Sequence, residues 1–247
     1  MQNPVLILGA SGEIGTHIAR KFSQNGHSLL LHGNKNAPPK IRPSNDSQTI
    51  ETICTDLTDE QSVRTLFDFI EGKYDALAGV IFSVAQPFGN RLSHRTPWRV
   101  FDEQMQSQLK AAHLTLSAAY PMLKAHGKES AARALIISTE YSIGLPPVKI
   151  APYVAAKSAL NAYALSLAQE WLSSNIRVHI LAPGLLRSNL TSHIPELYLE
   201  ELIKKMPEKK LTSAEDVAHF AAFLMTADAD PLYGSIIPIT RGKRITY

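Results

Sequence analysis

The sequence predicts a single domain of the α/β class, built on a parallel sheet of seven strands that is doubly wound, with helices on both faces. Three observations carry this prediction. Short apolar runs alternate along the whole chain with longer stretches whose apolar residues recur at spacings of three and four. The first apolar run leads through a glycine-rich turn into a helix-like stretch. The length of 247 residues is within the range that one α/β domain reaches, so residues 1–247 are expected to form one domain.

The apolar runs are the expected strands. They are apolar at nearly every position, which is typical of parallel strands covered on both faces. Strict alternation with helices implies crossover connections between neighbouring strands. The seven runs are VLILGA (5–10), SLLLHG (28–33), TICTDL (52–57), GVIFSVA (79–85), ALIIST (134–139), RVHILAP (177–183) and GSIIPI (234–239).

The helix-like stretches carry end signals at several boundaries. Gly26 follows the first as a stop, Thr58 with Gln61 resembles a capping box, and Ser213 is the expected N-cap of the last. The expected helices are residues 14–26, 59–72, 98–123, 155–174 and 213–225.

Two segments lie outside this alternation. Residues 34–49 are polar and proline-rich, and they are expected to form a surface excursion between the second and third strands. Residues 185–212 follow the sixth strand and hold a helical piece around PELYLEELIKKM. Because open α/β sheets bind ligands beyond the carboxyl ends of their strands, this insertion is predicted to be a substrate lid. Its alternative is a surface decoration.

Composition excludes several classes of protein. A net charge of +3 and a pI of about 8.9, with scattered basic residues, do not indicate a nucleic-acid partner. The longest apolar runs are about half of what a bilayer crossing needs, so no membrane segment is expected. The single cysteine, Cys54, excludes an intrachain disulfide, and no metal-ligand spacing is present. With an apolar run beginning within four residues of the start, these features predict a cytoplasmic protein.

The turn after the first strand reads GASGEIG, with glycines spaced as G-x-x-G-x-x-G. Glycine permits a tight turn and close backbone approach, and the following helix N-terminus offers amide donors to a pyrophosphate. In a Rossmann-like fold this position binds a dinucleotide. The expected cofactor-binding residues of the turn are Gly9, Ser11, Gly12, Glu13, Ile14 and Gly15.

The end of the second strand indicates which cofactor is preferred. An acid that binds the adenine-side ribose is usual there, but this sequence has Gly33, followed by Asn34 and Lys35. Without the carboxylate a 2′-phosphate is not repelled, and Lys35 and His32 are expected to attract it. NADP(H) is therefore favoured over NAD. Glu13 counts against a nearby phosphate unless its side chain points to solvent.

The stretch YVAAK contains Tyr153 and Lys157, four residues apart. On a helix the two side chains share a face, and a cation beside a phenol lowers the phenol pKa. This spacing also occurs by chance on ordinary helix surfaces, so the pair gains weight only from its context.

With the glycine loop at its start and YVAAK past its middle, the sequence resembles the short-chain dehydrogenase/reductase family over essentially the whole chain. CTDLTDEQSV is similar to the end of the family's third strand, which implies that Asp56 and Leu57 border the adenine. APG at 182–184 is similar to the turn after the sixth strand. The resemblance implies that Pro183, Gly184, Leu186 and Ser188 contact the cofactor there, with Ser188 in place of the usual threonine.

The sequence departs from the family at three places. SVAQ stands where the family has Asn-Asn-Ala-Gly, so that Ser83 and Ala85 are the expected cofactor contacts. Gln108 aligns with the helix asparagine of the active site and is one methylene longer. Thr139 stands at the catalytic serine position, one residue farther from the tyrosine than usual, and Ser138 and Ser142 are its competitors.

The resemblance implies hydride transfer between a nicotinamide and a carbonyl or alcohol carbon. Tyr153 would be the proton donor, Thr139 would stabilise the substrate oxygen, Lys157 would hold the nicotinamide ribose and lower the Tyr153 pKa, and Gln108 would carry a water-linked proton path. The leading hypothesis is an NADP(H)-dependent reductase of a small or medium ketone or oxo-group substrate. The alternatives are a dehydrogenase running toward the ketone, and a cofactor-binding protein with weak or no catalysis.

The longer helices also suggest assembly. The apolar faces of residues 98–123 and 153–172 exceed what a monomer is expected to bury, and in the resembled family the equivalent helices pair subunits. A homo-oligomer, a tetramer or a dimer, is expected. Trp98 and Trp171 are predicted to be packing residues at helix edges, and His94 and Arg95 to lie in a solvated loop.

Overall fold

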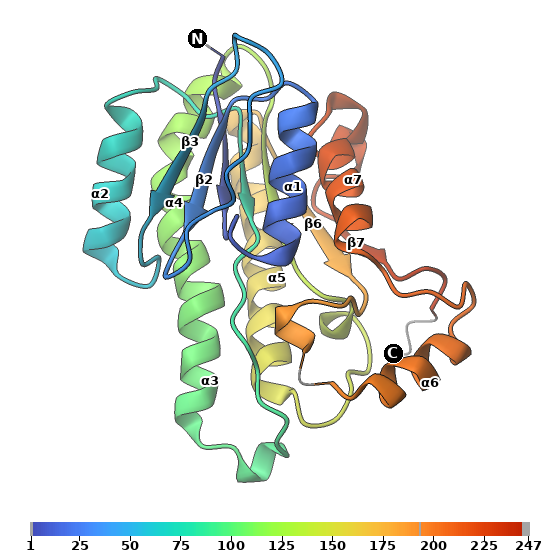
Figure 1. The fold of residues 1–247 in the computed structure, drawn as a ribbon. Helices are drawn as coiled ribbons and strands as arrows, with labels where there is room; N and C mark the ends of the chain where they lie inside the picture. Colours follow the sequence, from blue (N-terminus) through green and yellow to red (C-terminus); the bar gives the residue numbers. More distant parts are fainter. Residues whose placement is uncertain (1, 193, 244–247) are drawn as a thin grey trace.

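The computed structural model describes residues 2–192 and 194–243. Within them the chain forms a seven-stranded sheet in the order β3-β2-β1-β4-β5-β6-β7, with every neighbouring pair parallel (Figure 1). The predicted fold class and strand number are confirmed. The strands are β1 (Val5–Leu8), β2 (Leu29–Gly33), β3 (Ile50–Cys54), β4 (Gly79–Phe82), β5 (Ala132–Ile137), β6 (Ile176–Pro183) and β7 (Ile236–Ile239).

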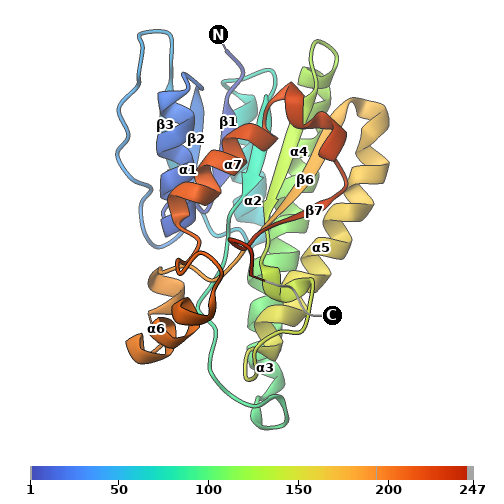
Figure 2. The same ribbon diagram turned by 90° about the vertical axis from the view of Figure 1, so that its right-hand side faces the viewer.

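Helices cover both faces of the sheet (Figure 2). Helices α1 and α7 lie on one face, and α2, α4 and α5 lie on the other. The α-helices are α1 (Glu13–Gln24), α2 (Glu60–Glu71), α3 (Trp98–Met105), α4 (Ala111–Gly127), α5 (Ala151–Trp171), α6 (Glu196–Lys205) and α7 (Ala214–Leu224).

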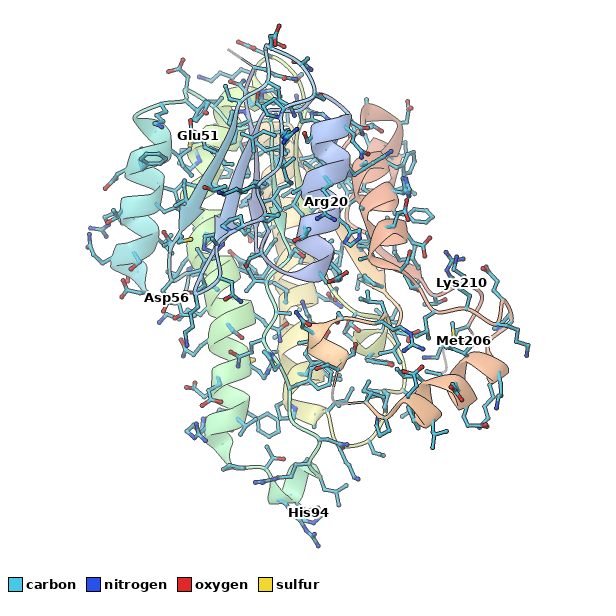
Figure 3. All side chains as sticks on the ribbon, in the orientation of Figure 1. Arg20, Glu51, Asp56, His94, Met206 and Lys210 are labelled. Atoms are coloured by element: carbon cyan, nitrogen blue, oxygen red, sulfur yellow. The ribbon has the colours of Figure 1, made fainter. Side chains whose placement is uncertain are left out.

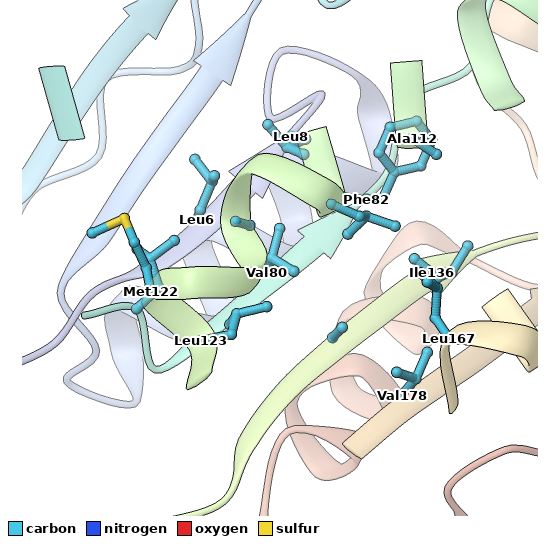
Figure 4. Close-up of a cluster of buried hydrophobic side chains, with 14 of the residues drawn as sticks. Leu6, Leu8, Val80, Phe82, Ala112, Met122, Leu123, Ile136, Leu167 and Val178 are labelled. Atoms are coloured by element: carbon cyan, nitrogen blue, oxygen red, sulfur yellow. The ribbon is translucent and has the colours of Figure 1, made fainter. Parts of the chain in front are cut away.

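The two faces of the sheet explain why most strand positions are apolar. Along β1, Leu6 and Leu8 belong to the core under α2, α4 and α5, whereas Val5 and Ile7 belong to the core under α1 and α7. Alternate side chains of a strand point to opposite faces, so a sheet covered twice needs apolar residues at both. Figure 4 shows the first of these cores, in which Leu6, Val80 and Met122 lie close together.

The helix ends agree with the expected signals in two of three cases. Gly26 has φ +85°, which suits glycine, directly after α1. Ser213 caps α7, because its Oγ accepts from the Asp216 amide at 3.0 Å and the Asp216 carboxylate accepts from the Ser213 amide at 2.8 Å. The capping box at Thr58 and Gln61 was wrong. Asp59 is the N-cap of α2, and Thr58 instead donates to Asp56.

The predicted helix over 98–123 is interrupted. A π-helical segment, Gln106–Lys110, separates α3 from α4, and such segments often mark functional sites. Trp98, at the start of α3, is 73% exposed and stacks on Phe101, so its prediction as a packing residue was wrong. Trp171 is buried at the end of α5, as predicted.

The carboxyl ends of the strands meet at one edge of the sheet, the lower edge in Figure 1, and α3 and α6 extend beyond it. In Figure 3 Asp56 lies at this end of β3, whereas Glu51 lies at the opposite end. Cys54, exposed at the end of β3, pairs in register with Gly33 of β2. Residues 34–49 form no helix or strand, as expected, and return the chain to the start of β3.

Candidate active site and cofactor-binding edge

Helix α5 places Tyr153 and Lys157 at the lower edge of the sheet. Pro152 in the first turn suits a helix start, because its missing amide hydrogen needs no partner there. Both Tyr153 and Lys157 are buried. The Lys157 Nζ donates a hydrogen bond of 2.8 Å to the carbonyl of Ile137, the last residue of β5. The predicted pair is therefore held on one helix face against the end of a central strand.

Of the three candidate hydroxyls, that of Thr139 lies near enough to the Tyr153 phenol to lower its pKa. Both serines are engaged elsewhere. The Ser138 Oγ donates to Asn161 Oδ1 at 2.5 Å, and the Ser142 Oγ donates to the Thr139 carbonyl at 2.7 Å. Asn161 Nδ2 also donates to the Ser142 Oγ at 2.9 Å, which fixes the turn that carries Thr139. The role of Thr139 as the catalytic hydroxyl stays a prediction.

Burial raises the pKa of Tyr153 and lowers the pKa of Lys157. Desolvation raises the pKa of Tyr153 to about 12, and the nearby Thr139 side chain lowers it only in part. Desolvation also lowers the pKa of Lys157 to about 7. The expected lowering of the Tyr153 pKa by Lys157 is therefore wrong for the protein without cofactor, because burial outweighs every favourable contact.

Gln108 lies in the π-helical segment and is fully buried. This segment packs against α5, which carries Tyr153 and Lys157. Gln108 Nε2 donates to Gln104 Oε1 at 2.7 Å, whereas Gln108 Oε1 has no hydrogen-bond partner among the described residues. Buried side-chain acceptors are rarely left unpaired, so this oxygen is suited to receive a water or another donor.

The loop after β4 covers the tyrosine. The ring of Phe88 stacks on Tyr153, with centroids 4.4 Å apart and an interplanar angle of 29°. Contacts of this kind exclude water from the phenol face. Nothing in the sequence pattern singled out Phe88.

The glycine turn has the close packing that its spacing predicts. Gly9 has φ +82°, and a Cβ there would lie 2.7 Å from the carbonyl oxygen of Ser83. A Cβ on Gly15 would lie 2.2 Å from the Gly9 carbonyl oxygen. Gly12 is the N-cap of α1 and provides no side-chain cap, so the first-turn amides remain available to an anion. The turn and first helical turn contain Gly9, Ser11, Gly12, Glu13, Ile14 and Gly15, as predicted.

The Glu13 carboxylate is turned toward His17 on the next turn of α1, 3.8 Å away, and its side chain is 44% exposed. A phosphate near Glu13 was expected only if the Glu13 side chain pointed to solvent, and the partly exposed side chain meets this condition.

At the end of β2, His32 does not have its predicted role. Its side chain is buried, Nδ1 accepts from the Gly9 amide at 3.3 Å, and Nε2 donates to the Thr55 carbonyl at 2.8 Å. One nitrogen accepts, so the ring is neutral, and burial lowers its pKa further. The expectation that His32 attracts a phosphate is wrong. It joins the ends of β1, β2 and β3 instead.

The two residues after β2 remain suited to their predicted role, since Asn34 and Lys35 are exposed. Gly33 also has no room for a side chain, because a Cβ would lie 2.2 Å from the Asn36 carbonyl oxygen. The local backbone therefore excludes the acid that would favour NAD.

The other predicted cofactor contacts lie along the same edge. Asp56 Oδ1 accepts from the Thr58 amide and hydroxyl, and Leu57 is buried in the core. Ser83 and Ala85 follow β4, and the Ser83 carbonyl lies directly beside Gly9.

After β6, the Gly184 amide donates to the Ile239 carbonyl at 3.0 Å, and Leu186 is buried. The Ser188 amide donates to Thr191 Oγ1 at 3.0 Å, which caps the short turn that follows. Pro183 ends β6. The roles of these residues toward a cofactor stay predictions.

The sequence reading missed Asn161 and Gln104. Both were within reach of the argument used for YVAAK, since Asn161 follows Lys157 by four residues and Gln104 precedes Gln108 by four. It also missed the ion pair of Lys243 with the buried Glu140 at 2.7 Å. No spacing rule joins residues so far apart in the chain.

Across residues 2–192 and 194–243, no group of three or more His, Cys, Asp or Glu side chains is arranged to hold a metal ion. Among the same residues, no helix combines the length and apolar character needed to cross a membrane.

Comparison with known proteins agrees with this geometry. Residues 9–243 match the family model described as enoyl-(acyl carrier protein) reductase. The chain is 30% identical over 242 residues to the 3-oxoacyl-[acyl-carrier-protein] reductase FabG of Rickettsia conorii, covering 96% of this chain and 95% of that protein. It is 24% identical to a mouse 3-oxoacyl-[acyl-carrier-protein] reductase over the full length of both.

Solved structures share the fold. The chain is similar to the Pseudomonas aeruginosa RhlG/NADP active-site complex, with a TM-score of 0.84, 20% identity, and coverage of 98% of this chain and 96% of that one. It is similar to a short-chain type dehydrogenase/reductase from Mycobacterium ulcerans, with a TM-score of 0.86, 21% identity, and coverage of 98% and 90%. Together with the tyrosine, lysine and threonine gathered at the strand ends, these matches establish that the chain belongs to the short-chain dehydrogenase/reductase family and is an oxidoreductase of that type.

Proposed function

We propose that this protein is an NADPH-dependent reductase of ketone or oxo-group substrates. The observation that carries the proposal is the assembly of three groups at one strand edge: the Tyr153 phenol, the Thr139 hydroxyl near it, and Lys157 one helical turn beyond. The same groups suit an alcohol dehydrogenase running in reverse. Reduction is proposed as the direction because two relatives are reductases by name.

The choice of NADPH over NADH rests on the end of β2. The Gly33 backbone leaves no room for an acid, and Lys35 is exposed beside it. A lysine near a 2′-phosphate gains Coulomb energy that the ribose hydroxyl of NADH does not provide. The Pseudomonas aeruginosa neighbour is itself described as an NADP complex.

The residues present fit such a cofactor, since the uncapped α1 N-terminus and the side-chain-free Gly9 and Gly15 form a cradle for its pyrophosphate. When bound, NADPH supplies the hydride for the carbonyl carbon. Tyr153 then gives its proton to the developing alkoxide, and the Thr139 hydroxyl stabilises that oxygen. Lys157 has three ammonium donors, of which one reaches the Ile137 carbonyl and others serve the nicotinamide ribose. Gln108 Oε1 accepts from a water in a proton path.

The substrate class is proposed from the relatives. Two of them, from Rickettsia conorii and mouse, are 3-oxoacyl-[acyl-carrier-protein] reductases. We propose a 3-oxoacyl thioester as the first substrate class to test.

The test is a titration with NADPH and NADH, followed by loss of reduced-nicotinamide absorbance on a panel of carbonyl compounds. The panel contains a 3-oxoacyl thioester (acetoacetyl-CoA), a 2-enoyl thioester, and small aliphatic and aromatic ketones. Turnover of a carbonyl with NADPH is the expected result. Tight NADPH binding without turnover of any compound would support a cofactor-binding protein without catalysis, and a preference for NADH would overturn the role of Lys35.

Residues 185–212 are proposed as the substrate lid. Helix α6 lies in this segment, and Leu199, Met206 and Leu211 form a small apolar cluster of their own, separate from the two sheet cores. A segment with its own core can move without opening the main ones.

We also propose a cytoplasmic homo-oligomer, a tetramer or a dimer. On α5 and just after it, Leu165 and Leu172 are each 36% exposed, although most apolar residues of α4 and α5 are buried in the monomer. Light scattering coupled to gel filtration decides this, and a monomeric mass would refute it.

A further inference from the structure

We propose that Gln104 is a positioning residue that fixes the orientation of the Gln108 amide and so presents an acceptor, not a donor, to the active site. The proposal rests on the proposed reductase function, and it concerns a residue that does not itself touch the reacting groups. It starts from a chain of two hydrogen bonds that runs from the loop after β4 into the π-helical segment.

The series of hydrogen bonds begins at a backbone carbonyl. The Pro87 carbonyl can only accept a hydrogen bond, and Gln104 Nε2 lies 3.1 Å from it. Gln104 must therefore turn its amide nitrogen toward Pro87 and its Oε1 away. Gln104 is 1% exposed, so no bulk water offers the opposite orientation a compensating partner.

The second bond follows from the first. Gln104 Oε1 can only accept, so Gln108 must turn its own Nε2 toward it, and the two atoms are 2.7 Å apart. Gln108 Oε1 is then left pointing elsewhere, and it is the buried acceptor without a partner among the described residues. A free glutamine amide has two orientations, but here a backbone carbonyl selects one of them through Gln104.

The consequence concerns proton transfer. A water on the proposed path needs an acceptor at Gln108, and a flipped amide would present two donors instead. With Gln104 in place, a flip of Gln108 alone turns two amide oxygens toward each other, and a joint flip turns the Gln104 oxygen toward the Pro87 carbonyl. Either flip loses one buried hydrogen bond and leaves two acceptors opposed. Because Pro87 precedes Phe88, whose ring stacks on Tyr153, the same bonds tie this loop to the helix.

Two variants of Gln104 separate orientation from simple packing. Gln104→Met keeps the length of the side chain but removes both hydrogen bonds, and kcat with NADPH and acetoacetyl-CoA is expected to fall about tenfold. The Kd for NADPH is expected to stay within about twofold. Gln106→Met is the matched control. Gln106 lies two residues after Gln104, at the start of the π-helical segment, is only half-buried, and its side chain bonds outward to Asp102.

Gln104→Glu adds a signature that packing alone does not produce. In its protonated form the introduced carboxyl group can donate to the Pro87 carbonyl and accept from Gln108, which preserves the relay, whereas the carboxylate can only accept and so opposes Pro87. The kcat of this variant is expected to fall about tenfold as the carboxyl ionises with rising pH, on top of the wild-type profile. A Gln104→Met kcat equal to that of wild type, or a Gln104→Glu profile parallel to it, would overturn the inference.

A measurement without substrate keeps this test separate from that of the proposed function. In protein labelled with ¹⁵N-glutamine, one Gln108 Nε2 proton is expected downfield because of its bond to Gln104, with the resonance identified by its loss in Gln108→Leu. It should move upfield in Gln104→Met and stay in Gln106→Met. If wild type turns over no carbonyl, the proposed function fails, and the relay is then decided by this proton alone: an unchanged shift in Gln104→Met overturns it.

Discussion

Tyr153 carries the proton in the proposed reaction, and its hydroxyl can be removed with little effect on packing. Tyr153→Phe keeps a ring to stack on Phe88 and fills the same buried space. We expect kcat to fall by about 10²- to 10⁴-fold, as for other general acids, with the NADPH Kd within about twofold. Steady-state kinetics and a fluorescence titration measure the two. Tyr163→Phe on the same helix, where the hydroxyl bonds His113, should keep its kcat. A Tyr153→Phe enzyme with more than a tenth of wild-type kcat would contradict the assignment.

Lys35 is the residue on which the cofactor preference is expected to depend. Lys35→Ala should weaken NADPH binding by about fivefold and leave NADH binding nearly unchanged, because only the 2′-phosphate loses a cation. The effect should shrink at high salt, since Lys35 is exposed. Lys40→Ala, an exposed lysine farther along the same excursion, provides the comparison. Equal losses for both cofactors would show that Lys35 acts by some means other than the phosphate.

At the residue scale, the sequence predicted positions better than orientations. Gly33 and His32 were placed correctly at the end of the second strand, yet His32 turns inward to the Gly9 amide and Thr55 carbonyl. A polar side chain turns toward the face of its strand on which backbone groups of other strands need a hydrogen-bond partner. Such groups are set by the tertiary fold and leave no mark in local spacing.

At the scale of elements, the sequence predicted which residues share a helix face but did not predict a local irregularity of a helix. Four-residue spacing correctly put Tyr153 and Lys157 on one face of α5, because that periodicity is a property of any helix. The apolar pattern over 98–123 gave no sign of the π-helical segment. The extra residue of the π-helical turn shifts the spacing of the apolar residues only slightly. Because apolar residues occur before and after this turn, the shift is not visible in the sequence. The departure falls at Gln108, in a segment that packs against α5.

The capping box of α7 gives a prediction of stability. Ser213→Ala removes the acceptor for the Asp216 amide and should lower the free energy of unfolding by about 1 kcal/mol. Denaturant unfolding measures the change. Ser166→Ala is the matched control, because Ser166 lies within α5, where alanine is favourable, and it only bonds back to the Ala162 carbonyl. Equal stability of Ser213→Ala and wild type would mean that the Arg241 ion pair with Asp216 holds the helix start by itself.

For the whole molecule, His179 predicts how stability depends on pH. It is fully buried in β6, neither ring nitrogen has a partner among the described residues, and burial lowers its pKa to about 4. An unfolded histidine titrates near 6.5, so below that pH the unfolded chain binds the proton and the native chain does not. Stability is then complete above pH 6.5 and is lost as pH falls toward 4. Between pH 7.5 and 5.0 the loss from this residue is about 2 kcal/mol.

Urea unfolding at the two pH values tests this dependence. His179→Leu should lose about 2 kcal/mol less than wild type on acidification, because the titrating group is gone. His94→Leu, whose wild-type side chain is exposed, serves as control. Identical pH dependence of His179→Leu and wild type would exclude His179 as the source.

The architecture as a whole was predictable because it follows from burial. A strand covered on two faces is mostly apolar, as β1 is throughout, and strict alternation with helices leaves few topologies. The contacts that complete the site, such as Lys243 with Glu140 and Phe88 with Tyr153, join segments that no periodicity links.

The single thiol of the chain provides a fixed point for observing cofactor binding. Cys54 is the only cysteine in 247 residues, and it is exposed. It also pairs in register with Gly33, which immediately precedes Asn34 and Lys35. A maleimide fluorophore would therefore attach at one site, next to the proposed position of the adenine ribose. Its emission would report cofactor binding at that end of the sheet edge in every variant described above, including those that do not turn over substrate.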